Sequence, residues 1–137
     1  MFVKNSWYVA GWSDEVGQQK PLARIMLGEH VVLFRKTDGS VAALEDRCAH
    51  RRMPLSLGRI TDKDTLICPY HGLTYNSSGK CVHVPGQDAP GEIRIRSYPV
   101  EERAGMVWLW MGPPNKAEID KMFDCSWLER PGWHTTR

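Results

Sequence analysis

The sequence lacks several features that mark large classes of proteins. It has no excess of charge of one sign, because 18 basic and 16 acidic residues leave a formal net charge of +2. Proteins that bind nucleic acid through a basic surface differ from it in this respect. No apolar run approaches the roughly 20 residues of a membrane-spanning helix, and the first residues lack the pattern of a secretory signal. The sequence therefore predicts a cytoplasmic protein without nucleic-acid or membrane partners.

Glycine-rich phosphate loops, internal repeats and low-complexity segments are also missing, which argues against a nucleotide-binding fold and a repeat protein. Cysteine is scarce, with four residues in a chain of 137. In a reducing compartment these four are not first interpreted as disulfides. The length fits one domain of about 100 to 150 residues.

What the sequence does contain is a series of short apolar runs separated by turn residues. Strands are predicted at 6–10, 22–27, 31–34, 41–44, 65–67, 73–75, 80–84, 93–98 and 106–110. Hairpin turns are predicted at 37–40, where Asp-Gly tolerates positive φ, and at 76–79. Many short strands with polar turns predict an all-β fold, either an antiparallel β-sandwich or a small barrel.

The composition changes after Trp110. The proline pair in Met111-Gly-Pro-Pro-Asn115 predicts a linker, because it ends a strand and extends the residue before it. We expect a first domain over residues 1–112 and a second segment over 113–137. The second segment contains a predicted short helix at 116–123 but too few residues for a core of its own, so it is expected to be the truncated start of a larger domain.

Four residues with metal-binding side chains lie in two predicted loops. The first loop contains Cys48 and His50 in a Cys-x-His spacing, and the second contains Cys68 and His71 in a Cys-x-x-His spacing. Seventeen residues separate the two motifs. Two thiolates and two imidazoles at such short spacings predict a metal site.

The pairing within each loop bears on which metal is bound. Cys₂His₂ is a common structural zinc set, but zinc fingers usually take both cysteines from one knuckle and both histidines from one helical turn. In a Rieske [2Fe-2S] centre one iron is bound by two cysteines and the other by two histidines. Because each loop here supplies one of each, the sequence favours the two-iron cluster, with zinc as the alternative.

A second Cys-x-His spacing occurs in Cys81-Val-His83. Because residues 80–84 alternate like a strand, both side chains are expected on one face, with no loop to wrap a metal. We interpret them as a buried cysteine and an ordinary strand histidine. Cys125, His30 and His134 are isolated and receive no predicted role.

The wider context of the two loops resembles the N-terminal domain of the Rieske non-haem iron aromatic oxygenases, of the vanillate O-demethylase and dicamba monooxygenase type. The resemblance lies in Asn5-Ser-Trp-Tyr-Val-Ala10, Cys48-Ala-His-Arg-Arg-Met-Pro-Leu-Ser56, Cys68-Pro-Tyr-His-Gly-Leu73, Val84-Pro-Gly86 and Trp108-Leu-Trp110. It covers nearly the whole chain. It implies a Rieske-type antiparallel fold with a cluster-binding subdomain made of two loops.

This resemblance implies that Cys48 and Cys68 bind the buried iron and that His50 and His71 bind the outer iron, from which electrons leave. In the family, a flavin reductase or a ferredoxin donates the electrons. They pass to a mononuclear iron in a neighbouring subunit of a homotrimer. That iron needs two nearby histidines and a carboxylate, and the remaining histidines of this sequence are too far apart. The mononuclear Fe(II) is therefore expected only in a catalytic domain missing from this sequence.

Residues next to the ligands have predicted supporting roles. Gly72 lets the backbone pass close to the cluster, and Pro69 stiffens the turn that presents Tyr70 and His71. The loops lack the extra cysteine pair and the serine of high-potential respiratory Rieske proteins. This predicts a reduction potential toward the lower end of the Rieske range, which spans about −150 to +300 mV.

Two arginines follow the first histidine. Arg51 is interpreted either as part of a positive patch that docks an acidic reductase or ferredoxin, or as an ion-pair partner of Glu45 or Asp46. For Arg52 the ion pair is favoured.

Three functions fit the residues. The favoured one is electron transfer as the electron-accepting domain of an aromatic-ring oxygenase or O-demethylase. The second is a free-standing Rieske ferredoxin or small reductase subunit, and the third is a zinc-stabilised binding module without a redox role. In none of these does the chain alone contain an oxygen-activating site.

Overall fold

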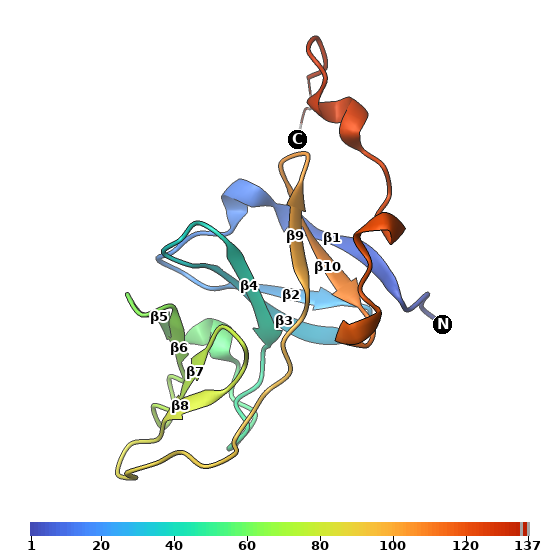
Figure 1. The fold of residues 1–137 in the computed structure, drawn as a ribbon. Helices are drawn as coiled ribbons and strands as arrows, with labels where there is room; N and C mark the ends of the chain where they lie inside the picture. The colour runs from blue at the N-terminus through green and yellow to red at the C-terminus, as the bar shows by residue number, and fades with distance from the viewer. Residues whose placement is uncertain (135, 137) are drawn as a thin grey trace.

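The computed structural model describes residues 1–134 and 136, and in this part of the chain it contains ten β-strands and no α-helix (Figure 1). The strands form three antiparallel sheets. The first has the order β1 (Ser6–Trp12), β10 (Met106–Met111), β9 (Val100–Arg103); the second β2 (Leu22–Met26), β3 (Glu29–Arg35), β4 (Val41–Glu45); the third β5 (Arg59–Ile60), β6 (Thr65–Ile67), β7 (Thr74–Asn76), β8 (Cys81–His83). The predicted all-β antiparallel fold is confirmed.

The second sheet is the central layer of the molecule, because both of its faces are covered. Val31 and Leu33 pack against the first sheet in one core cluster, whereas Val32 and Phe34 pack in another cluster with residues of the third sheet and its loops. All four side chains are fully buried. A strand covered on both faces has a continuous apolar sequence instead of an alternating one. This sheet therefore connects the β-sandwich to the loops that carry the predicted metal ligands.

Those loops lie at the end of the molecule formed by the third sheet, opposite the C-terminal segment (Figure 1). The first loop, residues 46–58, joins β4 to β5 and includes a single 3-10 turn, Leu55–Leu57. The second loop, residues 68–73, joins β6 to β7. After β8 the chain returns to the sandwich in an extended segment.

Three strand assignments differ from the structure, and one of them is the two-residue strand β5 (Arg59–Ile60), which was not predicted. Residues 93–98 do not form the predicted strand, and their β-pairing consists of the isolated bridges Lys80–Arg94 and Leu44–Ser97. The edge strand β9, by contrast, was not predicted, because Val100-Glu-Glu-Arg103 has no apolar alternation. Its residues are mostly exposed and are held by pairing with β10. In both cases tertiary pairing decides the structure and local pattern does not.

The predicted C-terminal helix at 116–123 occurs as separate 3-10 turns. These are Pro114–Lys116 and Ile119–Lys121, followed by Ser126–Glu129. Met122 and Cys125 pack against Trp108 of the first sheet, and Trp7 donates from Nε1 to the carbonyl of Glu118 at 2.9 Å. Tertiary contacts thus stabilise a segment too short to be a stable isolated helix. The division of the chain at residue 112 stays a prediction.

Among residues 1–134 and 136, no helix has the length and apolar character that crossing a lipid bilayer requires.

Arg35, at the end of β3, links the second sheet to the first. Its guanidinium donates to the carbonyls of Ser13, Val16 and Gly39 at 2.6–2.8 Å and to the carboxylate of Glu102 on β9 at 2.9 Å. Burial opposes ionisation of Glu102. The hydrogen bonds from Arg35 and Ser13 outweigh it, so the pKa of Glu102 lies below its ordinary value.

The core of the second sheet generates a first prediction. Leu44 is fully buried, whereas Leu57 has 69% of its surface exposed. We expect Leu44→Ala to lower the free energy of unfolding by about 2–5 kcal/mol, because it removes buried methyl groups and leaves a cavity. Leu57→Ala is the matched control and should change it by less than about 0.5 kcal/mol. Urea unfolding followed by circular dichroism measures both, and similar losses in the two variants would contradict the layered core.

The link between Arg35 and Glu102 generates a second prediction. We expect Glu102→Gln to cost about 1 kcal/mol of stability at pH 7. A carboxylate with a lowered folded-state pKa stabilises the protein above its unfolded pKa of about 4.3 and loses that contribution as the pH falls through the folded-state pKa. Urea unfolding at pH 7 and at about pH 3 should therefore show a difference between the two proteins that shrinks in acid. A difference that grows in acid would show that the sign is wrong.

Candidate metal centre

Both ligand loops close on their own cysteine through the same pair of backbone hydrogen bonds. In the first loop Cys48 N donates to Met53 O at 2.9 Å and Arg52 N donates to Cys48 O at 2.8 Å. In the second loop Cys68 N donates to Leu73 O at 2.8 Å and Gly72 N donates to Cys68 O at 3.1 Å. The two loops thus share one backbone pattern, with the cysteine paired to the fourth and fifth residues after it.

The same pattern places the fourth residue after each cysteine in the left-handed region. Gly72 has φ 79° and Arg52 has φ 56°. At Gly72 a Cβ atom would also come within 3.0 Å of the Pro85 side chain. The left-handed backbone therefore favours glycine at this position, and a Cβ atom there would need a shift of Pro85. Its role beside the cluster stays a prediction.

The four predicted ligands are brought together as two pairs. Cys48 and Cys68 are each only 2% exposed and belong to one core cluster. Burial raises the pKa of the Cys68 thiol, as does the directly interacting Cys48 side chain, and backbone hydrogen bonds from Tyr70 and His71 oppose this shift. His50 and His71 are exposed, with their Nδ1 atoms 3.0 Å apart and their ring centroids 4.7 Å apart.

This pairing fits a two-iron cluster better than a single ion. In the part of the chain that the structure describes, no three His, Cys, Asp or Glu side chains gather around one point, as a structural zinc site with four protein ligands would need. Two buried thiols and two exposed imidazoles, set apart as pairs, match the division of ligands between the two irons of a Rieske centre. The donor chemistry of these loops therefore fits a [2Fe-2S] cluster.

The family comparison agrees with this geometry. The family model described as the Rieske [2Fe-2S] domain matches residues 6–99. The chain belongs to the Rieske [2Fe-2S] family. The cofactor of this Rieske domain is a [2Fe-2S] cluster, as the sequence predicted.

Relatives of this Rieske domain include oxygenase components. The vanillate O-demethylase oxygenase subunit of Pseudomonas sp. (strain HR199 / DSM 7063) is 45% identical over 97% of this chain and 37% of its own length. The crystal structure of dicamba monooxygenase with non-heme iron and dicamba matches with a TM-score of 0.87 at 42% identity, over 95% of this chain and 40% of that chain. The resemblance to this oxygenase type is confirmed.

A more distant match is the reduced complex between oxygenase and ferredoxin in carbazole 1,9a-dioxygenase. It has a TM-score of 0.73 and 32% identity, over 80% of this chain and 29% of that chain. This Rieske domain spans about two fifths of the length of the first curated relatives it matches.

Tyr75 on β7 is a site residue that sequence reasoning missed. Its buried hydroxyl lies 3.3 Å from Cys48 Sγ and accepts a hydrogen bond from Ala49 N at 3.0 Å. Burial and the contact with Cys48 raise the pKa of the Tyr75 hydroxyl, so it stays protonated and can donate to the sulfur. The available signal was its position four residues after His71, but the sequence indicated only a strand there.

A pocket of about 370 Å³ opens beside the two exposed histidines. Its other walls are mainly apolar: Ala49, Leu73, Val84, Pro85, Gln87 and Ile93. On the second loop the exposed Tyr70 stacks against His71, with ring centroids 3.7 Å apart, and Pro69 is exposed between Cys68 and Tyr70. The edge of the site formed by His50 and His71, here named the histidine edge, therefore lies on an accessible, partly aromatic surface.

The ion pair predicted for Arg52 is wrong. Within the described residues neither Arg51 nor Arg52 forms a salt bridge. The carboxylate of Asp46 instead accepts hydrogen bonds from Ser56 N at 2.7 Å and Ser56 Oγ at 2.6 Å. The buried Asp46 is thus used to hold the first loop and is satisfied without an arginine.

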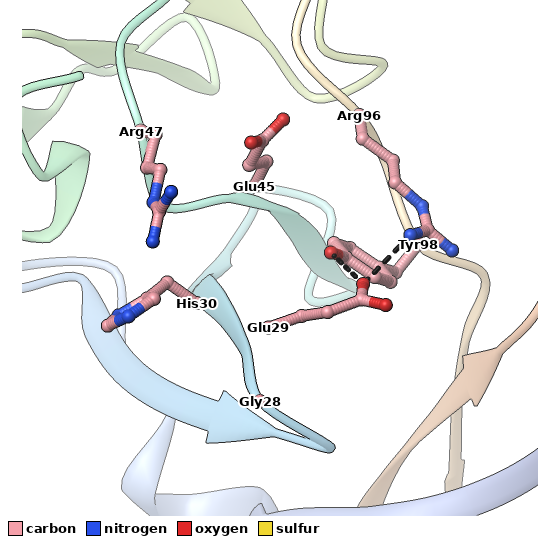
Figure 2. A pocket seen from close by; sticks show the side chains of 7 residues that line it. All are labelled: Gly28, Glu29, His30, Glu45, Arg47, Arg96 and Tyr98. Atoms are coloured by element: carbon pink, nitrogen blue, oxygen red, sulfur yellow. Dashed lines mark hydrogen bonds and ion pairs between the residues drawn. The ribbon is translucent and has the colours of Figure 1, made fainter. Parts of the chain in front are cut away.

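A second cavity, of about 260 Å³, has Arg47 of the first loop in its wall (Figure 2). Glu29 crosses it and accepts hydrogen bonds from Arg96 and Tyr98, both at 2.8 Å. Burial, with the Glu29 contact, raises the pKa of Tyr98. Glu45 and His30 complete the wall, and the arginine and glutamate charges balance. This cavity contains no thiol. The hydrogen bonds of Glu29 in it join β3 to the extended segment that follows β8.

The second Cys-x-His spacing does not form a ligand pair. Cys81 is fully buried opposite Tyr75 in the third sheet, whereas His83 is exposed. These exposures agree with the interpretation as a buried cysteine and an ordinary strand histidine.

Proposed function

We propose that this Rieske domain transfers single electrons, with Cys48 and Cys68 binding the buried iron and His50 and His71 binding the outer iron. The separation of a buried thiol pair from an exposed imidazole pair carries this proposal. When bound, a [2Fe-2S] cluster accepts and gives up one electron at a time. The residues of the chain provide the surroundings of the cluster.

The chain contributes a dry interior on one side of the site and an accessible edge on the other. Leu55 and Leu66 are fully buried in the same cluster as the two cysteines and exclude water from their sulfur atoms. Exclusion of water strengthens the hydrogen bond from Tyr75 to Cys48. His50 and His71 present their rings to solvent, where a redox partner can approach within electron-transfer distance.

We further propose that the chain acts as the electron-accepting part of an aromatic-ring oxygenase or O-demethylase. The similarity to the vanillate and dicamba enzymes over at least 95% of this chain supports this role. The solved complex of an oxygenase with its ferredoxin supports a ferredoxin as the donor, and a flavin reductase is the other candidate. In the same proposal, the electrons pass to a mononuclear Fe(II) in a catalytic domain missing from this sequence, and the full-length protein is a homotrimer.

The ligand assignment generates a third prediction. The chain reconstituted with iron and sulfide should bind two irons and no zinc and, when reduced, give a rhombic EPR signal. His71→Ala should abolish that signal, because it removes one of two imidazoles on the outer iron. His83→Ala, an exposed histidine on β8, is the control and should keep it. Metal analysis and EPR check the outcome, and loss of the cluster in the control alone would overturn the assignment.

Tyr75 generates a fourth prediction. A hydrogen bond to sulfur stabilises the more negative, reduced state, so Tyr75→Phe should lower the reduction potential. A bond worth about 0.5–1.5 kcal/mol corresponds to about 20–65 mV for one electron. Tyr70→Phe is a matched control, because Tyr70 is exposed and only its ring stacks on His71. A redox titration that gives equal potentials for Tyr75→Phe and the unmodified chain would rule out this role.

A further inference from the structure

Outside the two backbone hydrogen bonds of each cysteine, the two ligand loops are closed in different ways. In the second loop the next pairing belongs to a strand ladder, because Ile67 of β6 faces Thr74 of β7 in the antiparallel register. The first loop has no such ladder, because β4, which precedes it, belongs to the second sheet and β5, which follows it, belongs to the third. An interaction other than strand pairing must therefore close the outer end of the first loop.

The side chain of Asp46 provides this closure by binding Ser56. Its two carboxylate oxygens accept hydrogen bonds from Ser56 N at 2.7 Å and from Ser56 Oγ at 2.6 Å. Asp46 lies two residues before Cys48, and Ser56 lies eight residues after it, so these bonds enclose the part of the loop that carries both predicted ligands. We name the pair of Asp46 and Ser56 the aspartate clamp.

Both members of the aspartate clamp are anchored to the core. The backbone N of Asp46 donates to His30 O on β3 at 2.9 Å, and only 5% of the residue is exposed. Ser56 directly follows Leu55, which is fully buried in the core cluster that contains the two cysteines. The clamp therefore joins the first loop to the central sheet at one end and to the surroundings of the cysteines at the other.

The burial of Asp46 makes its two hydrogen bonds necessary. A buried carboxylate that loses a donor keeps its desolvation cost, and hydrogen bonds to charged groups are stronger than those between neutral groups. In the part of the chain that the structure describes, no salt bridge reaches Asp46. The carboxylate therefore depends on Ser56, and it favours the loop conformation that brings Ser56 to it.

A second aspartate makes the same pair of hydrogen bonds outside the ligand loops. Asp64, in the turn between β5 and β6, accepts from Thr37 N at 2.7 Å and from Thr37 Oγ1 at 2.9 Å. This pair joins that turn to the turn between β3 and β4, and neither turn carries a predicted ligand. The bonds alone thus tie two segments together, and a particular role of Asp46 must come from its position around Cys48 and His50.

We propose that Asp46 is a positioning residue for the cluster, which acts through Ser56 to hold the first ligand loop where its cysteine and histidine meet those of the second loop. The inference rests on the proposed function. The aspartate clamp gives the first loop the support that pairing of β6 with β7 gives the second. Ligands held in place by such outer contacts bind a metal centre more tightly and fix its geometry.

The test compares the loss of one hydroxyl group from each aspartate pair. Ser56→Ala and Thr37→Val both remove a single O–H donor to a carboxylate and leave the backbone N–H bond in place. In the chain reconstituted with iron and sulfide, release of iron to EDTA is followed by the loss of visible absorbance. We expect Ser56→Ala to release iron about two- to tenfold faster than the unmodified chain, as the loss of one hydrogen bond predicts. Thr37→Val is the control and should keep the unmodified rate.

Two variants of Asp46 distinguish positioning from a general loss of stability. Asp46→Ala should release iron faster than Ser56→Ala and shift the rhombic EPR signal, because no acceptor remains for Ser56. Asp46→Asn should restore both the rate and the signal toward those of the unmodified chain. Its amide oxygen can still accept from Ser56 N, and its amide nitrogen can donate to Ser56 Oγ.

The failure of this inference and the failure of the proposed function give different results. If the unmodified chain gives no Rieske signal, the proposed function fails. If the signal is normal but Ser56→Ala and Thr37→Val release iron at the same rate, the positioning inference alone is overturned. It is also overturned if Asp46→Asn behaves like Asp46→Ala. Should Asp46→Ala not fold, the comparison of Ser56→Ala with Thr37→Val decides on its own.

Discussion

The closure of each ligand loop on its own cysteine is the constraint on which the rest of the site depends. Two backbone hydrogen bonds per loop fix where the thiol enters the core and where the histidine leaves it. Because both loops use the same pattern, the cysteines meet in the buried cluster and the histidines meet at the surface. The pairing of ligands by type, which distinguishes a two-iron centre from a zinc site, therefore follows from backbone geometry.

The sequence predicted most of this site because its information is local. Spacing alone singled out Cys48, His50, Cys68 and His71, which the structure brings together as two pairs. Their binding of the cluster stays a prediction. The turn at 37–40 was predicted from Asp-Gly, and Gly39 indeed has φ 89° between the antiparallel strands β3 and β4.

The errors involve long-range contacts that no local pattern contains. Tyr75 reaches Cys48 across 27 positions of sequence, and β9 exists only because β10 pairs with it. The ion pair expected for Arg52 failed because Ser56 already satisfies Asp46. The expected helix at 116–123 gave way to turns held by the first sheet. Apart from the bond between Ser56 and Asp46 within the first loop and the pairing of the neighbouring strands β9 and β10, these contacts join residues far apart in the sequence.

The double burial of the central sheet has a consequence for how the domain can be altered. Along β3 and β4, successive residues belong to different neighbourhoods: Val31 and Leu33 to the sandwich, Val32 and Phe34 to the surroundings of the cysteines. Substitutions at neighbouring positions of these strands therefore affect two different core clusters. A library that varies only even-numbered positions of β3 would adjust the medium around the redox centre, whereas one that varies only odd-numbered positions would adjust the scaffold beneath it.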